Sequence, residues 1–398
     1  RISAGESVKS MDIVGSTLLR FSVQLDTVRR AKIYLGLYLF AFLAVLAMGY
    51  FVVFRERPEL LEFDEYEYIQ ISDRIMNGSY ETGSRRTLGF PLLVSAIRVI
   101  RDNFLFLQVI LAAVYAFSSP LIFRILDKLG VDRLPAVIAG LAFAVWPSSI
   151  YYGASVYSET AALPFFLLAL SILPSPWGKQ PGTRRTICMA LLSGLVLGVT
   201  AHIRPMYLLF IPIAALAILI EDQLRRIAWL KIGALVAGFM IVVMPWSVYM
   251  QEKYREPILL SANGGETLAG GLNPQLFDPA THRSFDVSRR EVWVGPGKWL
   301  PPYETGYLSE ADARLSYLEQ DKLLRVRAVA WMLANPVDAA VLEGYKIAYM
   351  WGIYPITKNS PSQIMFGNLP LLLLLLVTIS FLIACPWSRR RFVRLWSL

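Results

Sequence analysis

The sequence predicts an all-α protein that crosses a membrane several times. Hydrophobic residues make up 55% of its 398 residues and charged residues only 17%, whereas ordinary soluble domains are about a quarter charged. The apolar residues gather in runs of about 20, the length that a helix needs to cross a bilayer. Short clusters of Lys and Arg separate these runs, which is typical of cytoplasmic loops. We therefore expect a polytopic bundle of about eight or nine transmembrane helices.

The positive charge of the chain does not indicate nucleic-acid binding. Its net charge is +9, but most Lys and Arg lie between apolar runs, where they act as topology signals. The two cysteines, Cys188 and Cys385, both lie inside apolar segments. There they are expected to behave as small hydrophobic residues, so neither a disulfide framework nor a cysteine metal site is predicted.

The N-terminal part of the chain sets the orientation. Residues 1–32 form a basic segment that we place in the cytoplasm, and Met11–Lys32 within it is either an interfacial amphipathic helix or a plain basic tail. Ile33–Phe54 is predicted to be the first span. Residues 55–103 then form the first external loop, in which Leu92–Ile100 is too short to cross and is expected to lie at the interface.

Residues 33–250 are predicted to form the transmembrane bundle. Basic inner loops alternate with outer connections throughout it, and Ala201–Pro205 is expected to break a helix on the outer side. After the first span the predicted crossings are Phe104–Ile125, Leu134–Ile150, Val156–Leu173, Ile187–Thr200, Met206–Ile220 and Ile232–Met250.

The last third of the chain divides into two parts. Residues 251–335 are predicted to be a long external loop, rich in Gly, Pro and aromatic residues, that ends in an amphipathic helix over Leu308–Leu333. Residues 336–398 hold two apolar segments, Val337–Tyr354 and Phe366–Cys385, and a basic tail. A cytoplasmic tail requires one crossing here. Either the first segment is therefore re-entrant or partly inserted, or the positive-inside rule fails at this end.

This topology gathers ionisable residues on the outer side of the membrane. The first external loop supplies carboxylates and arginines, and the ends of later spans supply more. A carboxylate at that surface can act as a general base for an acceptor hydroxyl, and an arginine can bind a phosphate through two hydrogen bonds. Transfer of a group from a lipid phosphate needs both functions. The gathered residues are Asp64, Glu65, Arg85, Arg86, Glu159, His202 and Arg204.

Each of these residues also has a structural interpretation. Asp64 and Glu65 can be an exposed juxtamembrane charge cluster, and Glu159 can favour a helix N-terminus through its charge. Arg204 can reach toward lipid headgroups, and His202 can be a hydrogen-bonded structural residue. Arg85 and Arg86 can be interfacial anchors. Asn263 and Asn273 can simply belong to turns, because Asn-Gly and Asn-Pro pairs favour turns. Their common location favours a site.

Five stretches of the sequence resemble one known family. Phe63-Asp64-Glu65-Tyr66 resembles an Asp-Glu motif in a first external loop, and Arg86-Thr87-Leu88-Gly89-Phe90-Pro91 resembles a basic entry to a juxtamembrane helix. Three further stretches follow in the order that the family has: Tyr157-Ser158-Glu159-Thr160, the stretch from Gly194 to Arg204-Pro205, and Met244-Pro245-Trp246 with the Asn263 and Asn273 turns. Together they resemble the GT-C superfamily of polyprenyl-phosphate-sugar-dependent glycosyltransferases. The closest type is the protein O-mannosyltransferase and aminoarabinose-transferase type, often called family 39.

The resemblance implies a GT-C-type bundle and an inverting transfer of a sugar from a polyprenyl phosphate. Asp64 would be the general base, Glu65 would position a substrate, and Glu159 would contact sugar or acceptor. The donor phosphate would be held by Arg86 and Arg204, with Arg85, His202 and Lys346 as further candidates. Candidates for binding the acceptor or the sugar are Tyr66, Tyr68, Asn263 and Asn273.

The resemblance also implies where the protein works and with which molecules. The site would lie on the extracytoplasmic face of the plasma (inner) membrane, and the acceptor would be a glycan, a lipid or a protein. Asp64, Glu65 and Glu159 can converge on a divalent cation through oxygen ligands, although no cofactor is required by the pattern. Two alternatives stay open: a transporter or flippase of a lipid-linked intermediate, and a non-catalytic scaffold for envelope assembly.

Overall fold

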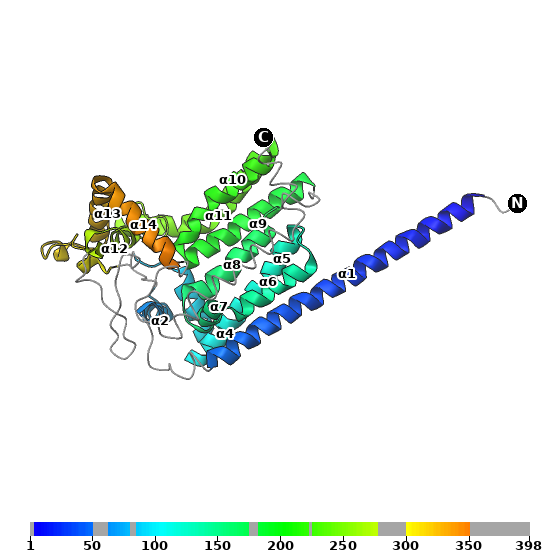
Figure 1. Cartoon of the computed structure of the whole chain (residues 1–398), viewed down its shortest axis with the longest axis horizontal. Helices are drawn as coiled ribbons and strands as arrows, with labels where there is room; N and C mark the ends of the chain where they lie inside the picture. The colour runs from blue at the N-terminus through cyan, green and yellow to red at the C-terminus, as the bar shows by residue number, and fades with distance from the viewer. Residues whose placement is uncertain are drawn as a thin grey trace. The chain divides into compact units, whose positions relative to one another are not determined.

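A computed structural model describes residues 4–50, 63–79, 85–174, 182–222, 225–277 and 300–350. In these ranges the regular structure is entirely helical, as predicted (Figure 1). The chain divides into two compact units, which we describe separately. The first consists of Arg1–Gly83 with Thr87–Leu260, and the second of Ser84–Arg86 with Ser261–Leu398. The predicted segment Phe366–Cys385 and the basic tail lie outside the described residues.

The first unit begins with α1 (Ala4–Gly49), a single helix of 46 residues. At 1.5 Å per residue it is about 69 Å long, more than twice the thickness of the hydrocarbon core of a bilayer. The segment Met11–Lys32 is therefore part of the same helix as the first span, with no break that would let it lie flat at the interface. The N-terminal half of α1 extends away from the other helices of this unit (Figure 1).

The rest of the first unit is a bundle of shorter helices. Two of them, α2 and α3, follow the first predicted span, and α3 (Gly89–Ile100) is the short helix that the sequence predicts over Leu92–Ile100. The 3-10 helix η2 (Pro205–Leu209) separates α9 from α10. The helices are α2 (Phe63–Met76), α4 (Phe104–Ala116), α5 (Ser118–Lys128), α6 (Arg133–Val145), α7 (Pro147–Ala154), α8 (Ser158–Ile172), α9 (Thr183–Ile203), α10 (Phe210–Asp222) and α11 (Arg226–Tyr254).

The described helices account for four or five membrane crossings. Asp26–Ala47, Phe104–Lys128, Thr183–Ile203 and Arg226–Tyr254 are long and apolar enough to span, and α6 with α7 forms a fifth if this pair, bent by 58°, counts as one. Two predicted crossings, Val156–Leu173 and Met206–Ile220, instead appear as the shorter apolar helices Ser158–Ile172 and Pro205–Ile220. The described ranges thus do not contain eight or nine spanning helices. Hydropathy alone treats each apolar run as one span, whereas breaks make some of the helices shorter than the run.

Helices α9 and α11 pack unusually closely through glycines. A Cβ atom at Gly194 would lie 2.0 Å from the backbone oxygen of Leu235, and one at Gly238 would lie 2.2 Å from that of Leu191. Such contacts require residues without side chains, as is common where membrane helices meet. The packing fixes the position of α9, whose C-terminal end carries His202 and Arg204.

In its described part, the second unit has three α-helices, α12 (Gly264–Gly271), α13 (Tyr317–Ala334) and α14 (Pro336–Met350). The short 3-10 helices η3 (Pro274–Phe277), η5 (Pro302–Glu304) and η6 (Asp312–Arg314) lie between α12 and α13. The predicted helix Leu308–Leu333 begins only at Tyr317. Ser316 caps it, because its side chain accepts a hydrogen bond from the Glu319 backbone while the Glu319 side chain bonds back to Ser316. This Ser-x-x-Glu capping box is the sequence signal for the true start.

Candidate functional site

The acidic motif lies in the first turn of α2, and one face of this helix is buried. Glu65, Tyr68 and Ser72 recur at spacings of three and four residues and are 2%, 5% and 0% exposed. This spacing places them on one side of the helix. Tyr66 lies on the opposite side and is 55% exposed, while Asp64 is half-buried.

Glu65 connects α2 to the turn between α7 and α8. Its Oε1 atom accepts a hydrogen bond of 2.9 Å from the backbone N–H of Val156. Tyr68, one turn further along, packs edge-on against Phe90 of α3 with ring centroids 4.7 Å apart. The structure therefore places Tyr68 in the core. The predicted general base, Asp64, is adjacent to a carboxylate that is held firmly in place.

Glu159 and Arg204 form an ion pair between the start of α8 and the end of α9. Arg204 Nη1 lies 2.7 Å from Glu159 Oε2, and both side chains are about a third exposed, at 33% and 30%. The same Nη1 donates to Ser158 Oγ at 3.0 Å, and Ser158 Oγ donates to Glu159 Oε2 at 3.1 Å. Arg204 has an extended backbone, which Pro205 favours in the residue before it. We call Ser158, Glu159 and Arg204 the polar set.

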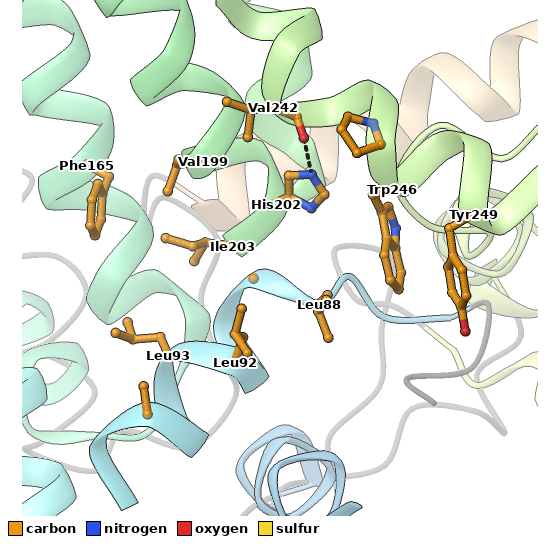
Figure 2. A pocket seen from close by; sticks show the side chains of 13 residues that line it. Leu88, Leu92, Leu93, Phe165, Val199, His202, Ile203, Val242, Trp246 and Tyr249 are labelled. Carbon is orange, nitrogen blue, oxygen red and sulfur yellow. Dashed lines mark hydrogen bonds between the residues drawn. The ribbon is translucent and has the colours of Figure 1, made fainter. Parts of the chain in front are cut away.

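A pocket of about 610 Å³ lies beside the end of α9, between α3, α8, α9 and α11 (Figure 2). Its volume is in the range of about 300–1,000 Å³ that is usual for ligand sites. The walls are almost entirely apolar. They are formed by Leu88, Gly89, Leu92, Leu93, Ala96, Phe165, Val199, His202, Ile203, Val242, Pro245, Trp246 and Tyr249.

His202 is held in the pocket wall by a hydrogen bond between its Nε2 atom and the carbonyl oxygen of Val242, at 3.1 Å (Figure 2). A carbonyl only accepts, so Nε2 carries the proton. Pro245 lies inside α11 and has no N–H to donate to the neighbouring carbonyl of Ile241. The structural interpretation of His202 is supported by its bond to Val242.

Gly89, in the motif from Arg86 to Pro91, stands at a position that has no room for a side chain. A Cβ atom at this position would lie 2.6 Å from the backbone carbon and oxygen of His202. Only a glycine lets the start of α3 approach the end of α9 this closely. The motif from Arg86 to Pro91 therefore builds one wall of the pocket.

Arg85 belongs to the second unit, where it pairs with a carboxylate that the sequence did not single out. Arg85 Nη2 lies 2.8 Å from Glu266 Oε1, and the Tyr317 hydroxyl donates to Glu266 Oε2 at 2.6 Å. Burial and the charge of Glu266 raise the pKa of Tyr317. Glu266 follows the Asn263-Gly264-Gly265 turn, and this turn was the only sequence signal near it. Arg86 is half-buried and falls in the same unit.

The two predicted asparagines bracket α12 in the second unit. Asn263 stands at its N-cap position, and its Oδ1 accepts a bond from Ser261 Oγ at 3.1 Å. Asn273 is fully buried, and its amide donates to the carbonyl oxygens of Ala269 and Gly270. Both positions therefore support the fold of this unit.

Lys346, on α14, also lies in the second unit. Its Nζ atom is 2.6 Å from Glu343 Oε1, and it passes so close to Gly271 that a Cβ there would lie 2.8 Å from Nζ. The predicted site residues thus fall into two groups. Those that share the first unit are Asp64, Glu65, Tyr66, Tyr68, Glu159, His202 and Arg204, and those in the second are Arg85, Arg86, Asn263, Asn273 and Lys346.

A cation site is not evident in the described part of the chain. There, no three His, Cys, Asp or Glu side chains lie close enough together to hold a metal ion. Glu159 is committed to Arg204 and Glu65 to Val156. Two of the three carboxylates that the sequence analysis considered as cation ligands therefore bind different partners.

The fold and the site define a helical, membrane-embedded protein with an apolar pocket next to a charged pair. Comparisons with protein-family models, with curated proteins and with solved structures found no match. The function therefore has to be argued from the site itself.

Proposed function

We propose that the protein is an inverting glycosyltransferase that moves a sugar from a polyprenyl phosphate to an acceptor on the extracytoplasmic face of the membrane. One observation carries the proposal: the three residues from His202 to Arg204 join two different environments. His202 and Ile203 line the apolar pocket, and Arg204 turns into the polar set. A lipid phosphate has the same two parts, an apolar chain and an anionic head.

The polar set suits a phosphate that leaves with negative charge. Arg204 is about a third exposed, so a ligand can reach its guanidinium. A phosphate there would compete with Glu159 for Arg204 and would be stabilised as the bond to the sugar breaks. Glu159 would then be released toward a sugar hydroxyl. The apolar pocket would hold the prenyl chain, with His202 and Tyr249 as its titratable wall residues.

Asp64 is the residue that we assign as general base. It precedes Glu65, whose bond to Val156 holds the first turn of α2 beside the start of α8. On this proposal the bundle is of GT-C type, and crossings beyond the described ranges would raise the count toward eight or nine. The second unit would belong to the external part that selects the acceptor.

The proposal is tested by transfer of radiolabelled sugar from a panel of polyprenyl-phosphate sugars to crude envelope acceptors. Asp64→Asn removes the base without changing the size of the side chain, and Glu67→Gln, one turn further along α2, is the matched control. We expect label to move from one donor, with Asp64→Asn reduced on the order of 100-fold and Glu67→Gln close to wild type. Equal transfer by Asp64→Asn would remove Asp64 as the base.

The role of the pocket is tested with a second pair of variants. Val199→Trp places a large ring in the pocket wall, and Leu192→Trp places the same ring two turns earlier on α9, outside the pocket. We expect Val199→Trp to raise the KM for a long-chain donor at least tenfold and to leave a short-chain donor unaffected. Movement of lipid across liposomes without a new glycosidic bond would instead favour the flippase alternative.

A further inference from the structure

Three tyrosines that the sequence analysis did not assign meet at the corner between α7 and α8. The ring centroids of Tyr151 and Tyr152 are 5.6 Å apart, those of Tyr152 and Tyr157 are 6.0 Å apart, and those of Tyr151 and Tyr157 are 6.4 Å apart. The Tyr152 ring stands at 78° to Tyr151 and at 70° to Tyr157, while the other two are inclined by only 36°. We call these three residues the tyrosine corner.

The corner has two walls that meet nearly at a right angle, and it is partly open. Tyr152 is 37% exposed, and Tyr151 and Tyr157 are half-buried. Tyr151 also packs against the core of α1 and α4, so it supports the corner from behind. A ring that lies flat against one wall meets the other wall with its edge.

The backbone that carries the corner is held rigidly. Thr160 Oγ1 donates to the carbonyl oxygen of Tyr152 at 2.6 Å, and Ser155 Oγ donates to that of Tyr151 at 2.7 Å. A Cβ atom at Gly153 would lie 2.8 Å from the Tyr115 ring, so this glycine lets α7 pack closely on α4. Rigid support lowers the entropy cost of binding a ligand.

The corner lies within one turn of the chemistry that we assign above. Tyr157 follows Val156, whose backbone N–H binds Glu65. It precedes Ser158 and Glu159, which bind Arg204. Aromatic residues of an interfacial belt are distributed around a membrane protein. Here they gather between two buried or paired carboxylates.

We propose that the tyrosine corner is a carbohydrate subsite that binds the ring of a pyranose. One face of a pyranose presents C–H bonds, whose slight positive charge is attracted to the negative face of an aromatic ring. Its rim presents hydroxyls, which suit the carboxylate and guanidinium of the polar set. A neutral sugar is favoured over a cation, since Arg204 already neutralises the negative charge of Glu159. This inference rests on the proposed function and deepens it.

The test is saturation-transfer NMR on the purified full chain in detergent, with methyl pyranosides of glucose, mannose, galactose and N-acetylglucosamine as probes. Sorbitol, a linear polyol, is the ligand control. We expect ring C–H signals from at least one pyranoside and none from sorbitol. The signals should fall at least fivefold in Tyr152→Leu and Tyr157→Leu, which keep bulk without a ring face.

Two further variants separate stacking from structure. Tyr152→Phe keeps the ring and should stay within twofold of wild type, and Tyr303→Leu removes a highly exposed tyrosine of the second unit and should behave in the same way. Unfolding midpoints of all variants check the fold. Equal signals for wild type and Tyr152→Leu, or pyranoside signals no larger than those of sorbitol, would overturn the subsite.

This binding readout does not depend on transfer. Pyranoside signals in a protein that transfers no sugar would keep the tyrosine corner and remove the enzyme. Normal transfer by Tyr152→Leu and Tyr157→Leu would keep the enzyme and remove the corner.

Discussion

The two units each contain a carboxylate bound to an arginine, but the two pairs are built differently. Glu159 and Arg204 are both about a third exposed, and Ser158 Oγ bonds to both side chains. Glu266 is buried, with its side chain 6% exposed, and it receives both the Tyr317 hydroxyl and Arg85, which is itself 42% exposed. In the first pair the carboxylate is accessible to a ligand, and in the second it is buried.

On the proposed function, this difference separates a functional pair from a structural one. An exposed pair contributes little to stability, because water screens it and both side chains lose freedom. A buried carboxylate with two donors costs much more to disturb, since the partners are left without bonds away from water. The sequence presents both as Glu near aromatic residues. Only the burial of each carboxylate distinguishes their roles.

The largest expected effect comes from Arg204→Gln. This change removes the guanidinium that we assign to the donor phosphate, and transfer should fall on the order of 100-fold or more. The free energy of unfolding should change by less than about 1 kcal/mol, because the pair is half-exposed. Parallel transfer assays and thermal unfolding measure both quantities, with Arg101→Gln, an exposed arginine after α3, as the control. A large loss of stability with little loss of transfer would reverse the comparison.

Glu266→Gln should give the opposite result. The amide cannot accept from Arg85 and Tyr317 as a carboxylate does, and we expect a loss of about 2–3 kcal/mol in the free energy of unfolding of the second unit. Proteolysis and hydrogen exchange in α12 and α13 report on that unit. Glu343→Gln, which changes an exposed carboxylate of the same unit, is the control. An unchanged exchange pattern in α12 would show that Glu266 is not structural.

Tyr317→Phe is a milder test of the same buried pair. It removes the 2.6 Å hydrogen bond to Glu266 Oε2 and keeps the ring. We expect a loss of about 1 kcal/mol, less than that of Glu266→Gln because Arg85 still pairs with the carboxylate. The measurement is again exchange in α12. A loss as large as that of Glu266→Gln would mean that the phenol, not the ion pair, holds this core together.

The smallest effect concerns pH and a carboxylate whose side chain is only 14% exposed. Asp312 accepts from Arg327 and from Ser309, and the bond to Arg327 contributes most to lowering its pKa from 3.8 to about 2. Because the pKa of Asp312 is lower in the folded state than in the unfolded state, its ionised form stabilises the fold at pH values above the ordinary pKa of 3.8. This contribution is lost as the pH falls through about 2. The stability difference between wild type and Asp312→Asn should therefore be present at pH 5 and vanish in strong acid. Denaturation at a series of pH values in a non-ionic detergent measures it. A constant difference would contradict the assignment.

Much of the fold was predictable because apolar runs and proline or glycine breaks are local signals. The break near Pro205, the short helix at Leu92–Ile100 and the helical class are all confirmed. The number of crossings was not predictable in this way. A run such as Val156–Leu173 is mostly apolar, but its helix begins only at Ser158 and is 15 residues long.

The site was harder to predict, because burial depends on which face of a helix meets its neighbours. Glu65 and Tyr66 are adjacent in the sequence, yet one is buried and the other exposed, once α2 begins at Phe63. Asn263 and Asn273 carried turn signals, and the structure uses them to bound α12. The tyrosine corner was not predictable from the sequence, since it depends on the turn that brings Tyr151 and Tyr152 of α7 next to Tyr157 at the start of α8.

The short helices around the polar set also bear on the surrounding lipid. Helix α8 has 15 residues and α6 has 13, which correspond to about 22 and 20 Å at 1.5 Å per residue. The hydrocarbon core is about 30 Å thick, so a helix of either length crosses it alone only where the bilayer thins locally. On the proposed function, such thinning beside α8 would bring lipid headgroups toward Arg204. A lipid substrate would then present its head to the protein without leaving the leaflet.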